Sequence, residues 1–235
     1  MCVALVSTVH AQMFSMDKHE GRLLQANVPY NEFFAGFEPT NIEYKGTPDV
    51  DGAGQYEYDN PILRVGYSGR ALNLFMGVGG SITGSSNVAY FDVGGNLNTY
   101  LSLYSTKGFS LQLPFRISSR YVNMTNDQTA VKMESFRFGD ILAGAGLQLL
   151  ARPADDLRAQ ITAIPSYGFT FATGGFFGGG MGSFALNGRL FFDHLFSRQM
   201  GLSLGYKYDL RNYRVDRDRY DYRMQGHSIQ VGITF

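Results

Sequence analysis

The sequence predicts an all-β fold, a transmembrane up-and-down antiparallel β-barrel of about ten strands, within a range of roughly eight to twelve. Apolar and polar residues alternate over long segments, which is typical of strands with two chemically different faces. Turn residues separate these segments at regular intervals. In the last segment of the chain every second residue is apolar, namely Ile229, Val231, Ile233 and Phe235, and the residues between them are small or polar. Because a terminal strand still needs partners for its backbone groups, we expect the sheet to close on itself.

Composition agrees with this fold class and excludes several functions. The 235 residues include 29 Gly, 15 Tyr and 19 Phe, whereas charged residues make up 17%, as expected for aromatic strands joined by glycine-bearing turns. The formal net charge of +0 gives no electrostatic reason for a nucleic-acid partner. No phosphate-binding loop, CxxC pair or HExxH motif occurs, so we expect no cofactor.

The amino-terminal residues predict export. Residues 1–11 resemble the remnant of a signal peptide, a short apolar stretch that ends in Val9-His10-Ala11 before Gln12. The single cysteine, Cys2, lies in this stretch. Residues 12–29 are polar without firm periodicity, which favours a periplasmic tail or a short plug, and residues 30–235 form the predicted barrel domain.

No apolar run approaches the ~18–20 residues of a membrane-spanning helix. The best candidate, Ile141 to Ala151, is too short and contains Gln148. The chain therefore either stays soluble or crosses a membrane as a closed barrel.

The predicted strands follow one another with little intervening sequence. The first is the weakest, because Pro39 interrupts its alternation. Many segments exceed the ~5–6 residues of a soluble strand and suit tilted strands that cross a bilayer in ~9–11 residues. The segments are 30–45, 55–67, 71–83, 87–104, 109–124, 134–151, 157–173, 183–196, 200–215 and 222–235.

The connections between these segments alternate in length. Short turns are predicted at 68–70, 105–108, 152–156 and 197–199, and longer loops at 46–54, 123–133, 174–182 and 216–221, whereas 84–86 is a short exception. Outer-membrane barrels have short periplasmic turns and longer external loops. With both termini inside, an even strand number puts the short turns on the periplasmic side.

Alternation assigns a face to each residue but does not choose the orientation of the faces. In segment 200–215, Leu202, Leu204 and Tyr206 share one face, and Ser203 and Lys207 share the other. A soluble ligand-binding barrel would turn the apolar face inward. Strand length, tyrosines near strand ends, the export signal and the terminal aromatic residue favour lipid outside. Since the chain has no Trp, Tyr and Phe must supply any interfacial girdle.

The chain resembles bacterial outer-membrane β-barrel proteins over nearly all of its mature length, without assignment to a subfamily. The resemblance rests on the ending Ile233-Thr234-Phe235, the rhythm of turns and loops, and the cleavage-like sequence VHAQ. It implies location in the bacterial outer membrane, contact with its lipids and lipopolysaccharide, and a last strand, with Ile233 and Phe235, that the barrel-assembly machinery recognises. Gln230 stands where that family often has Gly.

The polar strand faces predict a network of charges in the lumen. Inside a narrow barrel, unpaired charges are costly, so we expect ion pairs and hydrogen bonds that bridge the interior. Such a network either fills and rigidifies the barrel or lines a constricted, porin-like path for small solutes. Ten strands are close to the filled end of the size range. The predicted residues are Arg64, Asp92, Arg116, Arg120, Asp140, Arg158, Arg189, Asp193, Lys207, Asp209 and Arg211.

Two dipeptides invite a catalytic interpretation. Asp193-His194 is comparable to the Asp–His couple of ten-stranded outer-membrane proteases, and His227-Ser228 offers a base and a nucleophile. Adjacent residues of a regular strand point to opposite faces, so neither pair can cooperate directly. We therefore expect no catalytic residues.

The predicted external loops carry three further features. Asp49, Asp51, Glu57 and Asp59 could bind a divalent cation, but their spacing is not that of an EF-hand, which favours a solvated acidic loop and no metal site. Phe176, Phe177 and Met181 lie in a glycine-rich segment that either contacts a partner or lipid, or folds inward. Residues 211–223 alternate charge and tyrosine, as expected of a hairpin above the membrane.

The sequence thus favours a non-catalytic barrel with a structural or partner-binding role, such as a subunit of a larger envelope complex with a protein partner. A narrow channel for small solutes is the first alternative. A lipid- or peptide-hydrolase of the outer membrane is the second, and a soluble lipocalin-like binder also remains open.

Overall fold

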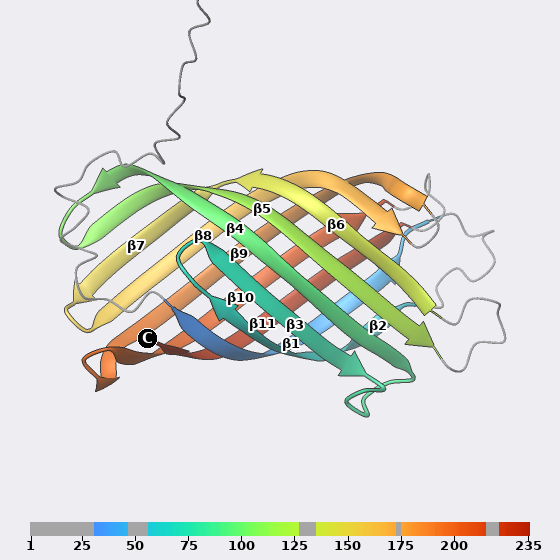
Figure 1. Cartoon of the computed structure of the whole chain (residues 1–235), viewed down its shortest axis with the longest axis horizontal. Helices are drawn as coiled ribbons and strands as arrows, with labels where there is room; N and C mark the ends of the chain where they lie inside the picture. The colour runs from blue at the N-terminus through green and yellow to red at the C-terminus, as the bar shows by residue number, and fades with distance from the viewer. Residues whose placement is uncertain (1–30, 47–55, 127–134, 173–174, 215–220) are drawn as a thin grey trace, which may run out of the picture.

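The chain forms a closed β-barrel in this computed structural model (Figure 1). The structure describes residues 31–46, 56–126, 135–172, 175–214 and 221–235, apart from the side chains of 172 and 175–178. The predicted signal remnant, 1–11, and the predicted tail or plug, 12–29, lie outside these residues. Within them, no helix is long and apolar enough to cross a membrane.

Eleven β-elements make up the sheet. Their bounds are β1 Glu32–Tyr44, β2 Tyr58–Ser68, β3 Leu72–Gly80, β4 Val88–Ser105, β5 Phe109–Asn126, β6 Ser135–Ala145, β7 Leu147–Ala154, β8 Leu157–Ala172, β9 Gly175–Ser197, β10 Met200–Tyr213 and β11 Tyr222–Thr234.

The sheet closes with ten strand positions. Every strand pairs antiparallel with its neighbour, β1 pairs with β11, and β4 pairs with β5. β6 and β7 occupy a single position, because both lie between β5 and β8. They are interrupted at Gly146, opposite Pro114 of β5, which has no N–H to donate to the ladder. The predicted ten-stranded antiparallel barrel is confirmed.

The strands are strongly staggered. A path around the barrel can be followed from each residue to its paired residue on the next strand. It starts at Glu32 of β1, goes first to Ser68 of β2, and finally passes from Tyr222 of β11 back to β1 at Tyr44. The path therefore returns 12 residues further along β1 than it began. With a rise of ~3.3 Å per residue and a strand spacing of ~4.7 Å, this shear corresponds to a tilt of about 40°. Transmembrane barrels have tilts of ~35–45°.

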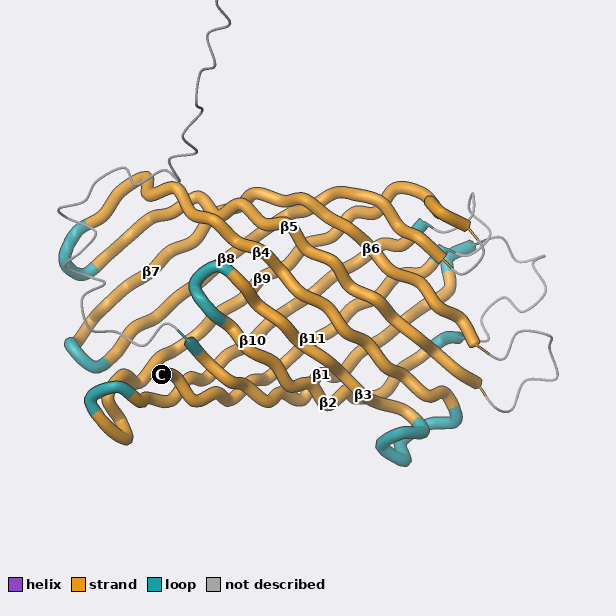
Figure 2. Tube along the Cα trace, viewed as in Figure 1, coloured by secondary structure: helices purple, strands orange, loops and turns teal. Residues whose placement is uncertain are grey.

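Four short turns lie toward one end of the barrel, on the left in Figure 2, and connect β2 to β3, β4 to β5, β7 to β8, and β9 to β10. The connection between β3 and β4, which includes the predicted short exception at 84–86, lies at the other end. Both ends of the described chain meet at the end with the four short turns, because the N–H of Asn31 donates to the carbonyl of Phe235 at 3.2 Å, and that of Phe235 donates back at 2.9 Å. We call this end the short-turn rim.

The prediction of a loop at 174–182 is wrong. β9 already begins at Gly175, and Gly182, Met181 and Gly180 pair with Tyr167, Gly168 and Phe169 of β8. The glycines indicated a loop in the sequence, but the ladder to β8 gives their backbone groups partners and keeps the segment extended. The predicted first strand is present as β1, although its pairing with β11 skips Glu38 and Pro39.

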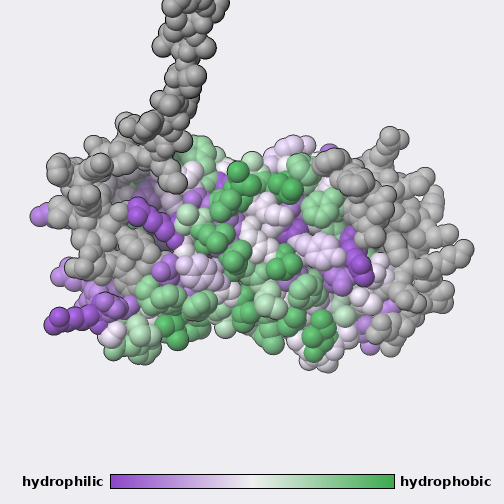
Figure 3. All heavy atoms as spheres, in the orientation of Figure 1, coloured by the Kyte–Doolittle hydropathy of each residue, from purple (hydrophilic) through white to green (hydrophobic). Residues whose placement is uncertain are grey.

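The apolar faces point outward, as predicted. Phe115, Leu204 and Ile229 are exposed on the outside of the barrel, whereas Arg120 and Asp209 are buried inside. Figure 3 shows many apolar side chains over the middle of the barrel and strongly hydrophilic ones at its left-hand rim. A closed barrel with this distribution matches a lipid environment, because its strands pair into a closed sheet and its outside exposes an apolar band.

At the short-turn rim, the end of β4 has a partner strand on one side only among the described residues. β3 begins at Leu72, opposite Leu97 of β4, and the N–H of Asn98 donates to the carbonyl of Ala71 at 2.8 Å. Beyond that point β4 continues to Ser105 and pairs only with β5 among the described residues. We call residues 99–105 the β4 edge.

The lipid-facing orientation predicts a depth-dependent cost of charge. Ile229 is 64% exposed in the middle of β11, so Ile229→Arg should reduce the free energy of unfolding by about 2–4 kcal/mol in urea titrations of barrels refolded into liposomes. Tyr104→Arg, at the rim, should cost about 0–1 kcal/mol. Equal costs for the two variants would contradict the orientation.

Candidate functional site: a filled and charged lumen

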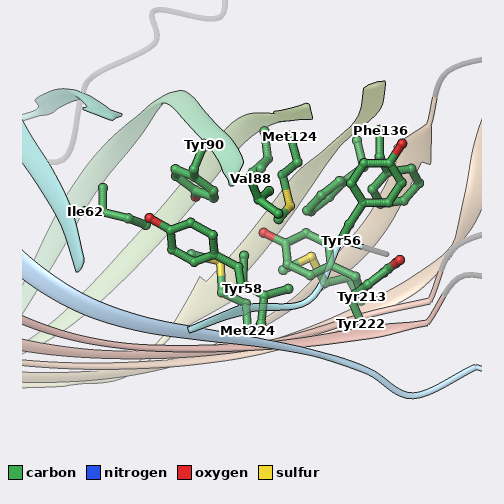
Figure 4. Packing of buried hydrophobic residues seen from close by; sticks show 14 of the residues in the cluster. Tyr56, Tyr58, Ile62, Val88, Tyr90, Met124, Phe136, Tyr213, Tyr222 and Met224 are labelled. Atoms are coloured by element: carbon green, nitrogen blue, oxygen red, sulfur yellow. The ribbon is translucent and has the colours of Figure 1, made fainter. Parts of the chain in front are cut away.

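An aromatic and methionine cluster fills the lumen toward the end opposite the short-turn rim (Figure 4). Phe138 meets Tyr213 edge-on at 4.7 Å between ring centroids, and Phe136 lies 5.1 Å from Phe138. Inward-pointing rings from β2, β4, β6, β10 and β11 thus meet within the barrel. We call this cluster the aromatic plug; it comprises Tyr56, Tyr58, Tyr90, Phe136, Phe138, Tyr213 and Tyr222 with Met124, Met181 and Met224.

Tyr56 joins the plug from the connection that precedes β2. Its ring stacks on Phe136 at 5.4 Å, and its side chain is buried. Burial raises the pKa of the Tyr56 hydroxyl above its usual value of 10.0, so the ring stays neutral at physiological pH.

A continuous chain of ion pairs crosses the middle of the lumen. Arg64 of β2 binds both carboxylate oxygens of Glu38, at 2.7 and 3.0 Å, and reaches Asp92 of β4 at 3.1 Å. Asp92 also accepts a hydrogen bond from Arg120 Nε at 2.6 Å. These side chains are almost completely buried, and paired, hydrogen-bonded charges are the form in which burial is tolerated.

The chain continues to the far wall of the barrel. Arg120 of β5 lies 3.5 Å from Asp209 of β10, a strand that is not its neighbour in the sheet. Asp209 accepts from Arg211 at 3.1 Å, and Arg211 donates to Asp140 of β6 at 2.8 Å. Positive and negative groups therefore alternate from β1 to β6 across the lumen. We call this series, Glu38–Arg64–Asp92–Arg120–Asp209–Arg211–Asp140, the ion-pair chain.

The plug and the ion-pair chain share hydrogen bonds. The Tyr90 hydroxyl donates to Asp92 at 3.2 Å and accepts from Arg120 at 2.9 Å, and the Tyr213 hydroxyl donates to Asp140 at 3.1 Å. The polar tips of plug residues thus satisfy charges that would otherwise be short of partners.

Amides and two separate ion pairs occupy the lumen nearer the short-turn rim. Gln148 accepts from Gln160 and from Thr162, each at 3.1 Å, and donates to Gln112 at 3.0 Å. The ion pairs there join Arg189 to Glu32, and Arg158 to Asp193 at 2.6 and 2.8 Å.

The structure brings most of the sequence-predicted lumen residues together, but not as one network. Arg64, Asp92, Arg120, Asp140, Asp209 and Arg211 belong to the ion-pair chain, and Lys207 joins it through Asp209 at 3.4 Å. Arg158 and Asp193 pair separately. Arg189 pairs with Glu32, and Arg116 donates to the amide oxygen of Asn98 at 2.8 Å.

Sequence reasoning missed two lumen carboxylates and the aromatic plug. Glu32 and Glu38 are an even number of residues apart in β1, so period-two alternation puts both on one face; Pro39 obscured that signal. The buried tyrosines share the inward face with the charged residues, where alternation alone gives no reason to expect a cluster.

The structure places the predicted loop features differently. Met181 is fully buried in the plug, which corresponds to the inward alternative rather than an exposed tip. The side chains of Phe176 and Phe177, together with Asp49 and Asp51, lie outside the described residues. Glu57 and Asp59 are exposed, and no group of three or more potential metal ligands occurs in the described part of the chain.

The two dipeptides considered for catalysis do not form a base–nucleophile arrangement. Asp193 faces Arg158 in the lumen, whereas His194, with a φ of 62°, contacts Asp156 in the β7–β8 turn at 3.0 Å. Ser228 is buried inside, and His227 bonds the Tyr206 hydroxyl at 2.7 Å on the outside. The expectation of a non-catalytic protein stays a prediction.

The terminal residues of the predicted assembly signal lie on the outer surface. Ile233 and Phe235 are exposed, and the Phe235 ring stacks on Phe33 at 5.3 Å. Phe33 also contacts Tyr67 at 5.4 Å, so aromatic side chains form part of a girdle at the short-turn rim.

Comparison with known proteins finds similar barrels but no family assignment. No family model and no curated protein matches the chain. Among solved structures, the barrel is similar to the outer membrane protease OmpT of Escherichia coli, with 7% identity over 88% of this chain and 94% of that one and a TM-score of 0.41. The attachment invasion locus protein Ail of Yersinia pestis, solved with sucrose octasulfate, has 9% identity over 88% and 99%, and a TM-score of 0.36.

Neisserial surface protein A has 14% identity over 86% of this chain and 97% of that one, with a TM-score of 0.34. At such scores these similarities carry no argument about function.

The location follows from the barrel itself: a closed, even-numbered antiparallel barrel with a charged interior and an apolar exterior belongs in the bacterial outer membrane.

The separate Arg158–Asp193 pair predicts strong coupling between two side chains. Asp193→Leu alone should cost about 3–5 kcal/mol of unfolding free energy, because it removes the carboxylate partner of a buried guanidinium. Adding Arg158→Leu should recover most of that loss. A double-mutant cycle in urea titrations measures the coupling.

The exposed pair Lys45–Glu43 provides the control. Glu43→Gln should leave the unfolding transition almost unchanged, because water screens exposed ion pairs. Additive costs for the two buried positions would show that Arg158 and Asp193 do not depend on one another.

Proposed function

We propose that the chain is a non-conducting outer-membrane barrel that holds a partner polypeptide at its periplasmic rim, as a structural subunit of an envelope complex. The observation that carries the proposal is the filled lumen. The aromatic plug and the ion-pair chain are stacked along the barrel axis, and their side chains are buried. A solute path would have to break several charge-assisted hydrogen bonds within a low-dielectric interior, which costs far more than thermal energy.

The β4 edge supports the partner-binding part of the proposal. An open edge presents unpaired N–H and C=O groups, which an extended peptide can pair with by adding a strand. Leu101, Leu103 and Tyr104 are exposed along this edge and provide apolar contacts for such a strand. The edge lies at the rim with the short turns, which face the periplasm in outer-membrane barrels. The expected occupant is therefore an extended segment of a periplasmic protein.

A barrel with a lumen blocked in this way should not conduct ions. Purified barrels in planar bilayers should show no steady openings, and neither should Arg116→Ala or Arg189→Ala. A combined variant with Tyr90→Ala, Phe138→Ala, Tyr213→Ala, Arg120→Ala and Asp209→Ala, checked for folding by heat-modifiable gel migration, should conduct and serves as the positive control. Steady wild-type openings that Arg116→Ala or Arg189→Ala alters would establish the narrow channel instead.

The partner should depend on backbone groups of the β4 edge. Because the N–H of Asn98 points toward β3, alternation directs the N–H groups of Tyr100 and Ser102 to the same, open side. Ser102→Pro therefore removes an edge donor without removing a bond to β5. Native gels of mildly solubilised envelopes should show a larger complex for wild type and Ser102→Ala, and the isolated barrel for Ser102→Pro.

Heat-modifiable migration of Ser102→Pro confirms that the variant is folded. A complex that survives Ser102→Pro, or a wild-type barrel that migrates alone in its native envelope, would overturn partner binding at this edge. Hydrolysis of lipid or peptide substrates in detergent that is lost in His194→Ala or His227→Ala would favour the enzymatic alternative.

A further inference from the structure

A small cavity in the lumen has an unusual lining. Its volume is about 60 Å³, and it lies between the ion-pair chain and the short-turn rim. Its cationic lining residues come from β2, β5, β9 and β10, whereas no Asp or Glu among the described residues lines it. These four residues are Arg64, Arg116, Arg189 and Lys207.

The four cations differ in how well their charge is balanced. Arg64 has two carboxylate partners, and Arg189 has Glu32. Lys207 shares Asp209 with Arg120 and Arg211. Arg116 has no carboxylate within salt-bridge distance among the residues described, and its bond to Asn98 supplies a dipole but no negative charge. Among the inward charged residues that the structure describes, one positive charge is therefore uncompensated.

A second, independent feature points to a missing hydrogen-bond acceptor. Arg189 lines the cavity with only 10% of its side chain exposed, and its Nε is buried without a partner in the described structure. The amide oxygen of Asn187, another lining residue, is also buried without a partner, and rotation of that amide by half a turn presents its NH₂ group instead. An unsatisfied buried donor is costly, and the cost is greater when the donor is charged.

Two aromatic side chains contribute to the lining. Phe34 and Phe75 pack closely against glycines of neighbouring strands, since a Cβ at Gly66 or Gly94 would lie 2.5 Å from the Phe34 or Phe75 ring. The guanidinium of Arg64 lies 4.9 Å from the centre of the Phe75 ring, and the ammonium of Lys207 lies 5.7 Å from it. The protein interior around the cavity has a lower dielectric constant than water, which strengthens the attraction between the cations and an anion that binds there.

We propose that this cavity binds one small monovalent anion, such as chloride. The anion accepts hydrogen bonds from Arg116 and from Nε of Arg189, and it balances the remaining positive charge. The volume exceeds the ~30 Å³ that one water molecule occupies in the liquid, but it is far below the ~300 Å³ of pockets for drug-sized ligands. The proposal is independent of the partner bound at the β4 edge.

Halide binding should raise the melting temperature of the intact barrel. In detergent, thermal unfolding is compared between sodium chloride or bromide and sodium gluconate at equal ionic strength and pH. Because an anion that binds only the folded state stabilises it by mass action, the melting temperature should rise with halide concentration and saturate. A melting temperature that depends on ionic strength but not on the identity of the anion would refute the site.

Variants of Arg116 separate a specific site from general salt effects. Arg116→Gln should weaken halide affinity at least about tenfold, as expected for the loss of one charged hydrogen bond. Arg116→Lys keeps the charge and should retain saturable binding, which covers the case in which Arg116→Gln does not fold. Arg152→Gln, near the end of β7 and outside the cavity lining, is the matched control and should behave as wild type. Equal halide responses in Arg116→Gln and wild type would overturn the proposal.

Crystals grown in sodium bromide give a direct readout. Anomalous scattering should place one bromide in the cavity, within hydrogen-bond distance of Arg116 and Arg189. Data with no bromide in the lumen, at a concentration that saturates the shift in melting temperature, would contradict the assignment.

Discussion

Closure of the backbone ladder is the constraint on which the rest of this structure depends. Lipid offers no hydrogen-bond partners, so every strand must find neighbours on both sides within the membrane. The pairing of β1 with β11 meets this requirement. Closure also separates two environments, and the period-two alternation of each strand then sorts its side chains between them. The apolar outer surface and the charged lumen therefore both follow from closure of the sheet.

The stagger of the strands decides which inward residues meet. A shear of 12 residues over ten strands brings the middle of β5 to the middle of β10, where Arg120 and Asp209 approach one another. It also brings rings from separate strands together in the aromatic plug. The interior therefore consists of successive layers along the axis: aromatic rings, alternating charges, and then amides with separate ion pairs.

The fold was predictable from the sequence because its signals are local. Turn residues mark the strand ends, and alternation assigns Arg120 and Asp209 to the polar face of their strands. Strand length and the export signal then favoured turning that face inward. Their mutual contact was not predictable, because it depends on the shear, which no short stretch of sequence encodes. Glu38 was missed because Pro39 disturbs the pattern next to it, and the start of β9 was missed because glycines in a paired strand resemble those of a loop.

The ion-pair chain limits how such a barrel can change its size during evolution. Hairpin duplication is the simplest way to enlarge a meander of antiparallel strands, because each new hairpin brings its own ladder. Here, Glu38 from the first strand and Asp209 from the tenth element belong to one series of charges. An inserted hairpin would move the opposite walls apart and leave buried arginines without counter-ions. Growth by whole hairpins is therefore incompatible with this interior unless the charges are replaced at the same time.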